Sequence, residues 1–109
     1  MGRRKLFQVE GDSMLPSLLP QQRLIVKPLP QAASAPEDGS VVVCRHPDDA
    51  ALVITKRVWR SQGQLLDLRG DNPLASTDSR HFGQVPLECV IGVVTAVIPS
   101  TGVRSDGRQ

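Results

Sequence analysis

The apolar residues of this chain come in short runs rich in Val and Ile, and these runs are separated by Gly, Pro, Asn and Asp. Short β-branched runs between turn-forming residues are typical of strands rather than helices. The runs that predict strands are 5–9, 23–27, 40–45, 52–60, 65–69 and 89–98, the last with a bend expected at Gly92. Only 13–19 could form a helical turn, and its prolines keep it short. The pattern predicts a small, mostly antiparallel β domain.

The length and composition suit one compact domain, since the chain has 109 residues and 39% hydrophobic content. We expect this domain to span 1–98, with an exposed loop at 29–39 and a flexible C-terminal tail at 99–109. The aromatic residues are Phe7, Trp59 and Phe82. The core must therefore consist of Val, Leu and Ile, and the aromatic platform on which single-stranded nucleic acids stack is absent.

The charge and the first residues exclude further classes of protein. The net charge is +2 without a basic stripe, so strong nucleic-acid binding is not expected. Polar residues follow the basic opening MGRRKLF where the apolar part of a signal peptide would begin, and no apolar run approaches the roughly 20 residues that span a bilayer. The sequence predicts a cytoplasmic protein without a membrane anchor. Cys44 and Cys89 are then expected to be reduced, although a disulfide between them stays open.

The run LVITKRVWR places a lysine among apolar neighbours. Because side chains alternate along a strand, Lys56 shares a face with Leu52 and Val58. If this is the core face, burial disfavours the ammonium form and lowers the pKa of Lys56, so that its amine can act as a base. Arg57 cannot take this role, because its guanidinium stays protonated. The alternative is that Lys56 extends its ammonium into solvent at a strand edge.

The stretch GDSMLP places Ser13 in a bend next to a glycine. Taken alone, it could be a turn in which Asp12 or Ser13 accepts backbone hydrogen bonds. A serine needs a base to attack a carbonyl carbon, and a neutral lysine amine within hydrogen-bond reach can supply one. Ser13 and Lys56 together therefore indicate a Ser-Lys dyad, for which neither residue is decisive alone.

A third segment, RGDNPLASTDSRHFGQV, is dense in residues that fix local geometry. Gly70 allows a sharp turn, and the Asn-Pro pair after it enforces one. We expect Asp78 and Arg80 to form a salt bridge that closes the loop. Ser76 could be a capping hydroxyl, or it could hydrogen-bond the amine of Lys56 and hold it toward the nucleophile.

The three segments, in this order, resemble the motifs of the signal peptidase I family, whose serine proteases use a Ser-Lys dyad. GDSMLPSL resembles the nucleophile motif, ITKRV the lysine motif, and GDNPLASTDSRHFGQV the last motif. DGSVVVCRHP resembles the strand between the first two, although Ser40 stands where an aspartate is usual. The resemblance covers most of residues 7–94. It implies the mostly antiparallel, barrel-like β fold of the signal peptidase catalytic core.

The resemblance also implies roles for individual residues. Ser13 would be the nucleophile and Lys56 the general base, with the backbone N–H of Ser13 holding the oxyanion. Ser76 would orient Lys56. The supporting positions that the resemblance implies are Gly11, Asp71, Ser76, Asp78 and Arg80, the last two bracing the loop. Some signal peptidases carry a hydroxyl residue where this chain has Gly11, so only main-chain donors are expected. No cofactor and no metal is implied.

The short chain and the start RRKLFQVEGDSMLPSL are similar to the proteases that mature nickel-type superoxide dismutases in bacteria. This similarity implies a soluble endopeptidase that removes the N-terminal propeptide of the dismutase precursor and exposes its nickel-binding N-terminus. The nickel would belong to the substrate. The alternatives are a signal peptidase-like or self-cleaving-repressor-like protease with another substrate, and a non-catalytic binding module on the same fold. A helix-turn-helix does not fit before Gly11, which disfavours the repressor.

The two histidines could belong to two other kinds of site. A Ser-His-Asp hydrolase could use His46 or His81, but the charge of Arg80 beside His81 would disfavour an imidazolium. Both histidines are expected to lie at the surface or in loops. A zinc site could combine the two histidines with Cys44 and Cys89, but their spacing matches no tight pair of ligands. We expect neither site.

Overall fold

The computed structural model describes residues 3–30 and 33–99. Its strands are β1 (Lys5–Gln8), β2 (Arg23–Pro28), β3 (Val41–His46), β4 (Asp49–Gln62), β5 (Leu65–Arg69), β6 (Val85–Pro86) and β7 (Val90–Ile98). The helical elements of the described part are α1 (Ser79–Phe82) and the 3₁₀ turn η1 (Leu87–Cys89). The predicted mostly antiparallel β fold is confirmed. Residues 13–19 form a series of turns, and among these the backbone N–H of Leu18 donates to the carbonyl oxygen of Met14 at 2.9 Å, which is the single helical turn that the sequence allowed.

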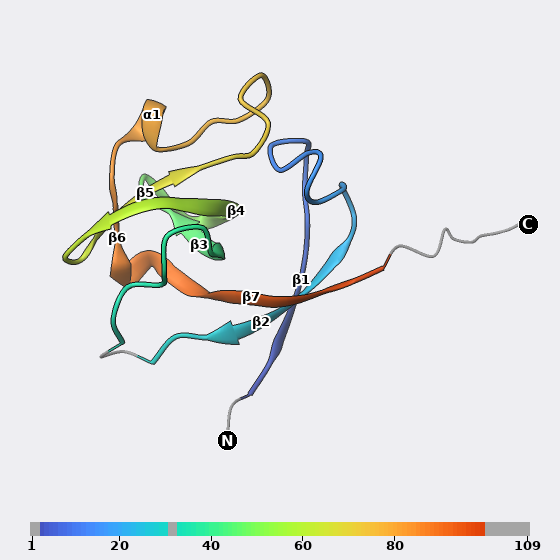
Figure 1. Cartoon of the computed structure of the whole chain (residues 1–109), viewed down its shortest axis with the longest axis horizontal. Helices are drawn as coiled ribbons and strands as arrows, with labels where there is room; N and C mark the ends of the chain where they lie inside the picture. The colour runs from blue at the N-terminus through green and yellow to red at the C-terminus, as the bar shows by residue number, and fades with distance from the viewer. Residues whose placement is uncertain (1–2, 31–32, 100–109) are drawn as a thin grey trace, which may run out of the picture.

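The strands form one antiparallel sheet in the order β1-β2-β7-β3-β4-β5-β6. β7 pairs with β2 and with β3, and it thereby connects the two halves of the sheet that Figure 1 shows below and above it. β7 continues through Gly92 as one strand, and its pairing with β3 shifts register directly beside this glycine, between the partners of Val43 and Cys44. The glycine allows close contact, because a Cβ would collide with the carbonyl oxygen of Lys27 and lie 2.7 Å from a Val26 methyl.

Two apolar clusters form the core. The first lies between β3, β4, β5 and β6 and consists of Val42, Cys44, Val58, Leu66, Leu68, Val85 and Val90. The second lies at the other end of the sheet and consists of Val9, Met14, Leu18, Leu24, Val26 and Val43. Phe7 and Phe82 pack against the margins of these clusters, so the fully buried core is aliphatic, as the composition predicted.

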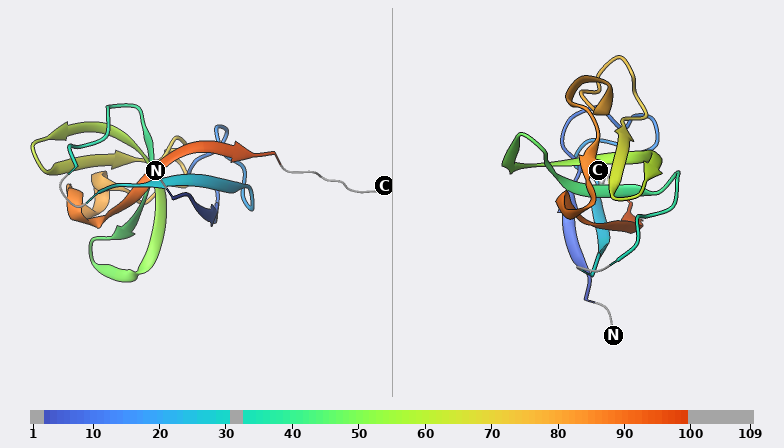
Figure 2. Two further views of the ribbon diagram at one scale, coloured as in Figure 1. Left: turned by 90° about the horizontal axis from the view of Figure 1, so that it is seen from below. Right: turned by 90° about the vertical axis from the view of Figure 1, so that its left-hand side faces the viewer.

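β4 is the longest strand and reaches beyond its neighbour on one side. β3 pairs with β4 at Asp49 and from Val53 to Arg57, with a register shift between them, whereas β5 pairs with β4 only from Arg57 onward. The part of β4 before Arg57 therefore has an unpaired edge among the described residues. Figure 2 shows the β3–β4 hairpin, in green, projecting from the body of the molecule. This edge faces the turn that follows β1 across a groove, and both surfaces belong to the site described next.

The predicted tail at 99–109 lies outside the described residues apart from Pro99. Residues 31 and 32 of the predicted loop at 29–39 also lie outside them. The rest of that loop is irregular and leads through a turn at 38–39 into β3, as the sequence predicted.

Candidate active site

Ser13 lies in the series of turns that follows β1. Gly11 has a φ of +73°, which is the left-handed conformation that glycine adopts without strain. Met14 and Leu18 are buried in the second apolar cluster, 1% and 5% exposed. Burial of side chains of this size contributes roughly 1.5–3 kcal/mol each, so the segment that follows Ser13 is anchored in the core. Ser13 itself is half-buried, and it lines the groove.

The loop after β5 holds this turn in place. The backbone N–H of Asn72 donates to the carbonyl oxygen of Ser13 at 2.8 Å, and its side-chain amide donates to the carbonyl oxygen of Asp12 at 3.1 Å. Gly70 packs beneath Ser13, where a Cβ would lie 2.6 Å from the same carbonyl oxygen. Figure 1 shows the two segments, in blue and yellow, meeting at the top of the molecule. The Gly-Asp-Asn turn thus positions the serine.

Lys56 lies on the buried face of β4, as the alternation of side chains predicted. Only 4% of the residue is exposed, and its register partner on β3 is Val42 in the first apolar cluster. Burial lowers the pKa of Lys56 below its usual value, and this effect outweighs the nearby carboxylate of Asp78, which acts in the opposite direction. The neutral amine is therefore more accessible here than on a solvated lysine. The alternative of an ammonium that extends into solvent is wrong.

A chain of hydrogen bonds runs from Lys56 into the loop before α1. The Nζ of Lys56 donates to the Oγ of Ser76 at 3.2 Å, and this hydroxyl donates to the Oδ2 of Asp78 at 2.7 Å. Arg80 donates to both oxygens of Asp78, at 3.0 and 2.7 Å, so the expected salt bridge is present. The backbone N–H of Gly70 donates to the same carboxylate at 2.9 Å. The network connects the turn below Ser13 with the amine of Lys56.

Asp78 is fully buried, and it stays ionised. Burial would raise its pKa, but the hydrogen bonds from Arg80, Gly70 and Ser76 favour the carboxylate and hold its pKa well below the usual range. Asp78 also begins α1, because its carboxylate accepts the backbone N–H of Arg80 and its own N–H donates to the side chain of His81. One carboxylate therefore organises the loop and the lysine together.

Ser13 and Lys56 line the same groove, which has a volume of about 610 Å³. Its walls are β1 and the following turn on one side and the unpaired edge of β4 on the other. The lining residues are Phe7, Gln8, Glu10, Gly11, Asp12, Ser13, His46, Leu52, Val53, Ile54, Thr55, Lys56, Ala75 and Thr77. No direct hydrogen bond joins Ser13 and Lys56 in the described part of the chain. Catalytic hydrogen bonds are often long without substrate and shorten when it binds.

Asp71 lies on the other side of β4. Its carboxylate accepts two hydrogen bonds from the guanidinium of Arg57, at 2.9 and 2.7 Å, and these lower its pKa. Arg57 also donates to the carbonyl oxygen of Gly39 at 2.8 Å. Asp71 therefore ties the Gly-Asp-Asn turn to β4 and supports the site without facing the groove.

The residues of the two alternative sites, a Ser-His-Asp triad and a zinc site, do not come together in the described part of the chain. His46 ends β3 and lines the groove, and its Nδ1 accepts the backbone N–H of Asp48 at 3.0 Å. Neither histidine hydrogen-bonds Ser13 among the described residues. Cys44 and Cys89 are free thiols, and burial raises the pKa of Cys44 to about 12. The part of the chain that the structure describes holds no group of three or more residues suited to a metal ion.

Sequence reasoning missed three contributors. The sequence marked Asn72 as the third residue of the Gly-Asp-Asn motif. Its hydrogen bond to Ser13 could not be predicted, because it joins two loops that are distant in the chain. Gly70 was assigned only the freedom of a turn, whereas its hydrogen atom faces Ser76 and Ser13. The groove position of His46 could have been found from the alternation along β3, which places it on the face of Cys44.

Comparison with known proteins identifies the family of the chain. The family model for signal peptidase, peptidase S26, matches residues 4–69, which include Ser13 and Lys56. The chain belongs to this family. Among curated proteins it is similar to the mitochondrial ATP-independent inner membrane protease subunit 1a of Arabidopsis thaliana, with 33% identity over 107 residues. The similarity covers 77% of this chain, and the chain spans 64% of the length of that relative. The loop with Ser76, Asp78 and Arg80 follows the matched residues.

The relative is named for an inner membrane, which makes membrane-spanning segments relevant. Among the described residues, no helix has the length and apolar character needed to cross a bilayer.

Proposed function

We propose that this protein is a serine endopeptidase in which Ser13 is the nucleophile and Lys56 the general base. The observation that carries the proposal is the buried amine of Lys56, which lines the same groove as Ser13 and is held by Ser76. A lysine used only for structure would expose its ammonium or pair it with a carboxylate. Here the partner is a neutral hydroxyl.

The direction of the hydrogen bonds supports this role. The carboxylate of Asp78 is ionised and can only accept, so the hydrogen of the Ser76 hydroxyl is committed to it. Ser76 can then only accept from Lys56. A neutral amine has two hydrogens and one lone pair. When one hydrogen donates to Ser76, the lone pair is free to accept the hydroxyl proton of Ser13.

The reaction follows from these positions. Lys56 takes the proton of Ser13 while the Oγ attacks the carbonyl carbon of the scissile peptide bond. The backbone N–H of Ser13, which donates to no acceptor within the described residues, stabilises the oxyanion of the tetrahedral intermediate. Lys56 then protonates the departing amine and leaves an acyl-enzyme. A water molecule that gives its proton to Lys56 hydrolyses this ester and releases Ser13.

The shape of the groove supports a peptide substrate in extended conformation. The unpaired edge of β4 from Leu52 to Thr55 lies along it, and a strand can add to such an edge through backbone hydrogen bonds. Leu52 and Val53 are 48% and 41% exposed, and they offer apolar contact beside that edge. A peptide bound there would run past both Lys56 and Ser13.

We further propose that the substrate is the precursor of a nickel superoxide dismutase, whose N-terminal propeptide is removed. This proposal rests on the resemblance of residues 3–18, RRKLFQVEGDSMLPSL, to the corresponding part of the proteases that mature those enzymes. The relative described above is named as a subunit of a mitochondrial inner membrane protease, and this name does not identify a substrate for the present chain. A cytoplasmic location is part of the proposal, and the free thiols of Cys44 and Cys89 are consistent with a reducing compartment.

The test is incubation of the purified protein with the dismutase precursor, followed by mass measurement of the new N-terminus. We expect wild type to release the propeptide, and Ser13→Ala and Lys56→Met to release none while keeping the melting temperature of the wild type within a few degrees. Ser34→Ala and Lys27→Ala are matched controls, because both side chains are exposed. Cleavage by Ser13→Ala or Lys56→Met with the same product would refute the dyad. Cleavage of other precursors but not of this one would refute only the substrate.

A further inference from the structure

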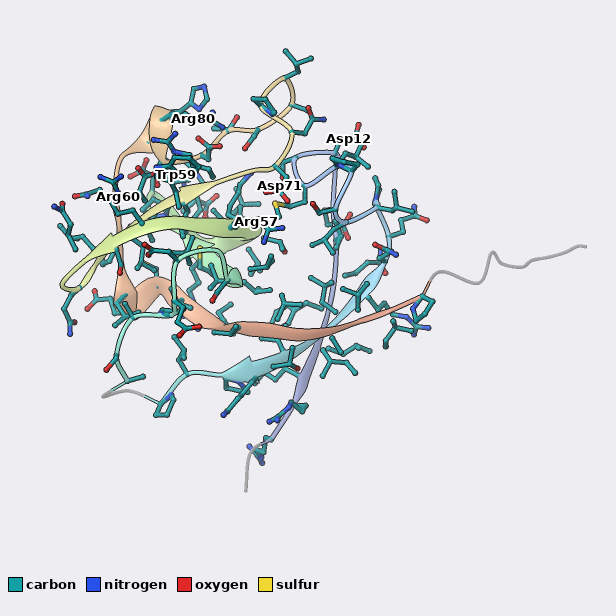
Figure 3. All side chains as sticks on the ribbon, viewed as in Figure 1. Asp12, Arg57, Trp59, Arg60, Asp71 and Arg80 are labelled. Carbon is teal, nitrogen blue, oxygen red and sulfur yellow. The ribbon has the colours of Figure 1, made fainter. Side chains whose placement is uncertain are left out.

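A second pocket lies on the opposite side of β4 from the groove. Its volume is about 360 Å³, and it is lined by Arg57, Trp59, Arg69, Gly70, Asp71, Pro73 and Arg80. Arg57 and Trp59 point away from the buried face that carries Lys56, as the alternation along β4 requires. Figure 3 shows the side chains of Arg57, Trp59 and Arg60 along the ribbon of β4, with Arg80 above them. The proposed peptidase reaction uses none of the side chains of β4 on this face.

Two arginines stand directly opposite each other in this pocket. Arg57 of β4 is the register partner of Arg69 of β5, and like charges in this position are destabilising. Each is compensated by its own aspartate, since Arg57 binds Asp71 and Arg69 binds Asp67 at 3.1 Å. The arrangement gathers cations on one patch of the sheet and holds them with flanking carboxylates.

The guanidinium groups are orientated and retain unused donors. Arg69 donates to Asp67 through Nε and Nη2, and Arg80 donates to Asp78 through the same two atoms. The Nη1 of neither group has a hydrogen bond within the described residues. The side chains of Arg57, Arg69 and Arg80 are 36%, 32% and 37% exposed, so each is partly desolvated and still open to a ligand.

Trp59 gives the pocket an aromatic wall. It is 56% exposed, and the guanidinium carbon of Arg69 lies 4.7 Å from the centroid of its ring. This cation–π contact fixes the plane of Arg69. Three guanidinium groups and one carboxylate, that of Asp71, line the pocket, while the carboxylates that pair with Arg69 and Arg80 lie outside the lining. The surface of the pocket therefore offers more hydrogen-bond donors than acceptors to a ligand.

We propose that this pocket binds an oxyanion, namely a carboxylate or phosphate group. Guanidinium groups with fixed planes match the geometry of such oxygens, and charge-assisted hydrogen bonds are roughly twice as strong as neutral ones. The group can come from an acidic segment of a protein bound at the groove or from a free phosphate. The proposal does not rest on the peptidase reaction, because the pocket contains neither Ser13 nor Lys56, and it shares only the supporting residues Gly70, Asp71 and Arg80 with the site described above.

Trp59 makes the proposal directly measurable, because it is the only tryptophan and the chain has no tyrosine. We would titrate the full chain, carrying Ser13→Ala so that no peptide is cut, and follow tryptophan emission at constant ionic strength. The probes are inorganic phosphate and a glutamate-rich peptide without aromatic residues, with sodium chloride as the reference salt. We expect a saturable change with at least one probe and none with chloride. Saturation by the peptide alone would identify an acidic protein segment as the ligand, and saturation by phosphate alone a free anion.

Arg69→Gln is the test variant, since it removes the guanidinium that lies against Trp59 and touches neither Ser13 nor Lys56. We expect it to weaken the apparent affinity at least about tenfold, as the loss of a hydrogen bond to a charged group would do. Arg23→Gln, an exposed arginine on β2, is the matched control and should titrate like its parent. The proposal fails if chloride gives the same change, if no probe saturates, or if Arg69→Gln binds as tightly as its parent. Binding of the probe to Arg69→Gln can also be followed by calorimetry, so altered emission alone cannot produce a false result.

Discussion

The hydroxyl of Ser76 donates to the buried carboxylate of Asp78 over 2.7 Å. This bond determines what Ser76 can offer to Lys56, because a hydroxyl has one hydrogen and Asp78 already accepts it. Ser76 is thereby an acceptor for the amine in either protonation state. The geometry of the proposed base is thus determined by a residue that never meets the substrate.

Replacing Ser76 with alanine should slow cleavage without abolishing it. The variant removes the acceptor that orients the amine, while Ser13 and Lys56 both remain. A lost hydrogen bond of this kind corresponds to roughly 1–3 kcal/mol, so we expect kcat to fall roughly tenfold to hundredfold with little change in KM. Steady-state kinetics on the precursor measure both constants.

Ser76→Thr is the conservative counterpart, because it restores a hydroxyl at the same position. Partial recovery of kcat would support orientation of Lys56 through the hydroxyl. A Ser76→Ala enzyme with the turnover of the wild type would show that the hydrogen bond to Lys56 has no part in catalysis.

Activity should rise with pH as Lys56 loses its proton. The pKa of Lys56 is lowered by burial, so activity should rise at a lower pH than that at which an ordinary lysine loses its proton. Arg80 contributes to this lowering, because its charge offsets the attraction of Asp78 for the ammonium. In Arg80→Gln the carboxylate would stabilise the ammonium more strongly, and the rise should shift to higher pH. The profile of kcat/KM against pH measures the shift.

The control for this shift is Arg23→Gln, which removes a similar charge from β2 and should leave the profile in place. A flat profile across neutral and alkaline pH in the wild type would contradict a lysine base altogether. An unchanged profile in Arg80→Gln would show that the ion pair with Asp78 does not influence Lys56.

Asp78 should make the free energy of unfolding depend on pH in the acidic range. Because its pKa is lowered in the folded state, the unfolded chain binds more protons at low pH, and stability falls as pH decreases. The contribution is fully present above about pH 4, near the ordinary pKa of 3.8 of an aspartate in an unfolded chain, and is lost progressively below it. Asp78→Asn should be less stable at neutral pH by roughly 2–4 kcal/mol and flatter in acid. Urea unfolding at several pH values would measure both effects.

Asp48→Asn provides the comparison, since Asp48 lies in the exposed turn between β3 and β4. It should unfold at the urea concentration of the wild type at each pH. Equal acid sensitivity in Asp78→Asn and the wild type would contradict the assignment of this effect to the buried carboxylate.

Gly70→Ala should disrupt both halves of the site. Its methyl group would collide with the Oγ of Ser76 and lie 2.6 Å from the carbonyl oxygen of Ser13. To relieve these contacts, the turn that contains Ser13 must move away from Lys56 and Ser76. We therefore expect loss of precursor cleavage together with a lower melting temperature. Gly63→Ala in the β4–β5 hairpin has no neighbour within 4 Å and should cost only the strain of its positive φ, about 1–2 kcal/mol. Full activity in Gly70→Ala would mean that the loop tolerates the shift.

Much of the fold was predictable because local physics determines it. Each predicted strand is present, since alternating or β-branched runs between turn residues have few other stable conformations. The face of Lys56 was also predictable, because side chains in a strand alternate regardless of what surrounds it. The predicted bounds of β4 were short by a few residues at both ends, since 49–51 and 61–62 contain none of the β-branched or aromatic residues that mark a strand in the sequence.

The tertiary structure decided how these parts meet. Burial of Lys56, the hydrogen bond from Asn72 to Ser13 and the common groove depend on the pairing of strands and loops far apart in the chain, and no local pattern encodes such pairing. The second pocket also arises from register, because only the pairing of β4 with β5 places Arg57 opposite Arg69. The sequence by itself determined the residue types, their faces and the order of the motifs. Only the folded chain determined which of them share a cavity, since long-range contacts set burial, and burial sets the pKa of a lysine.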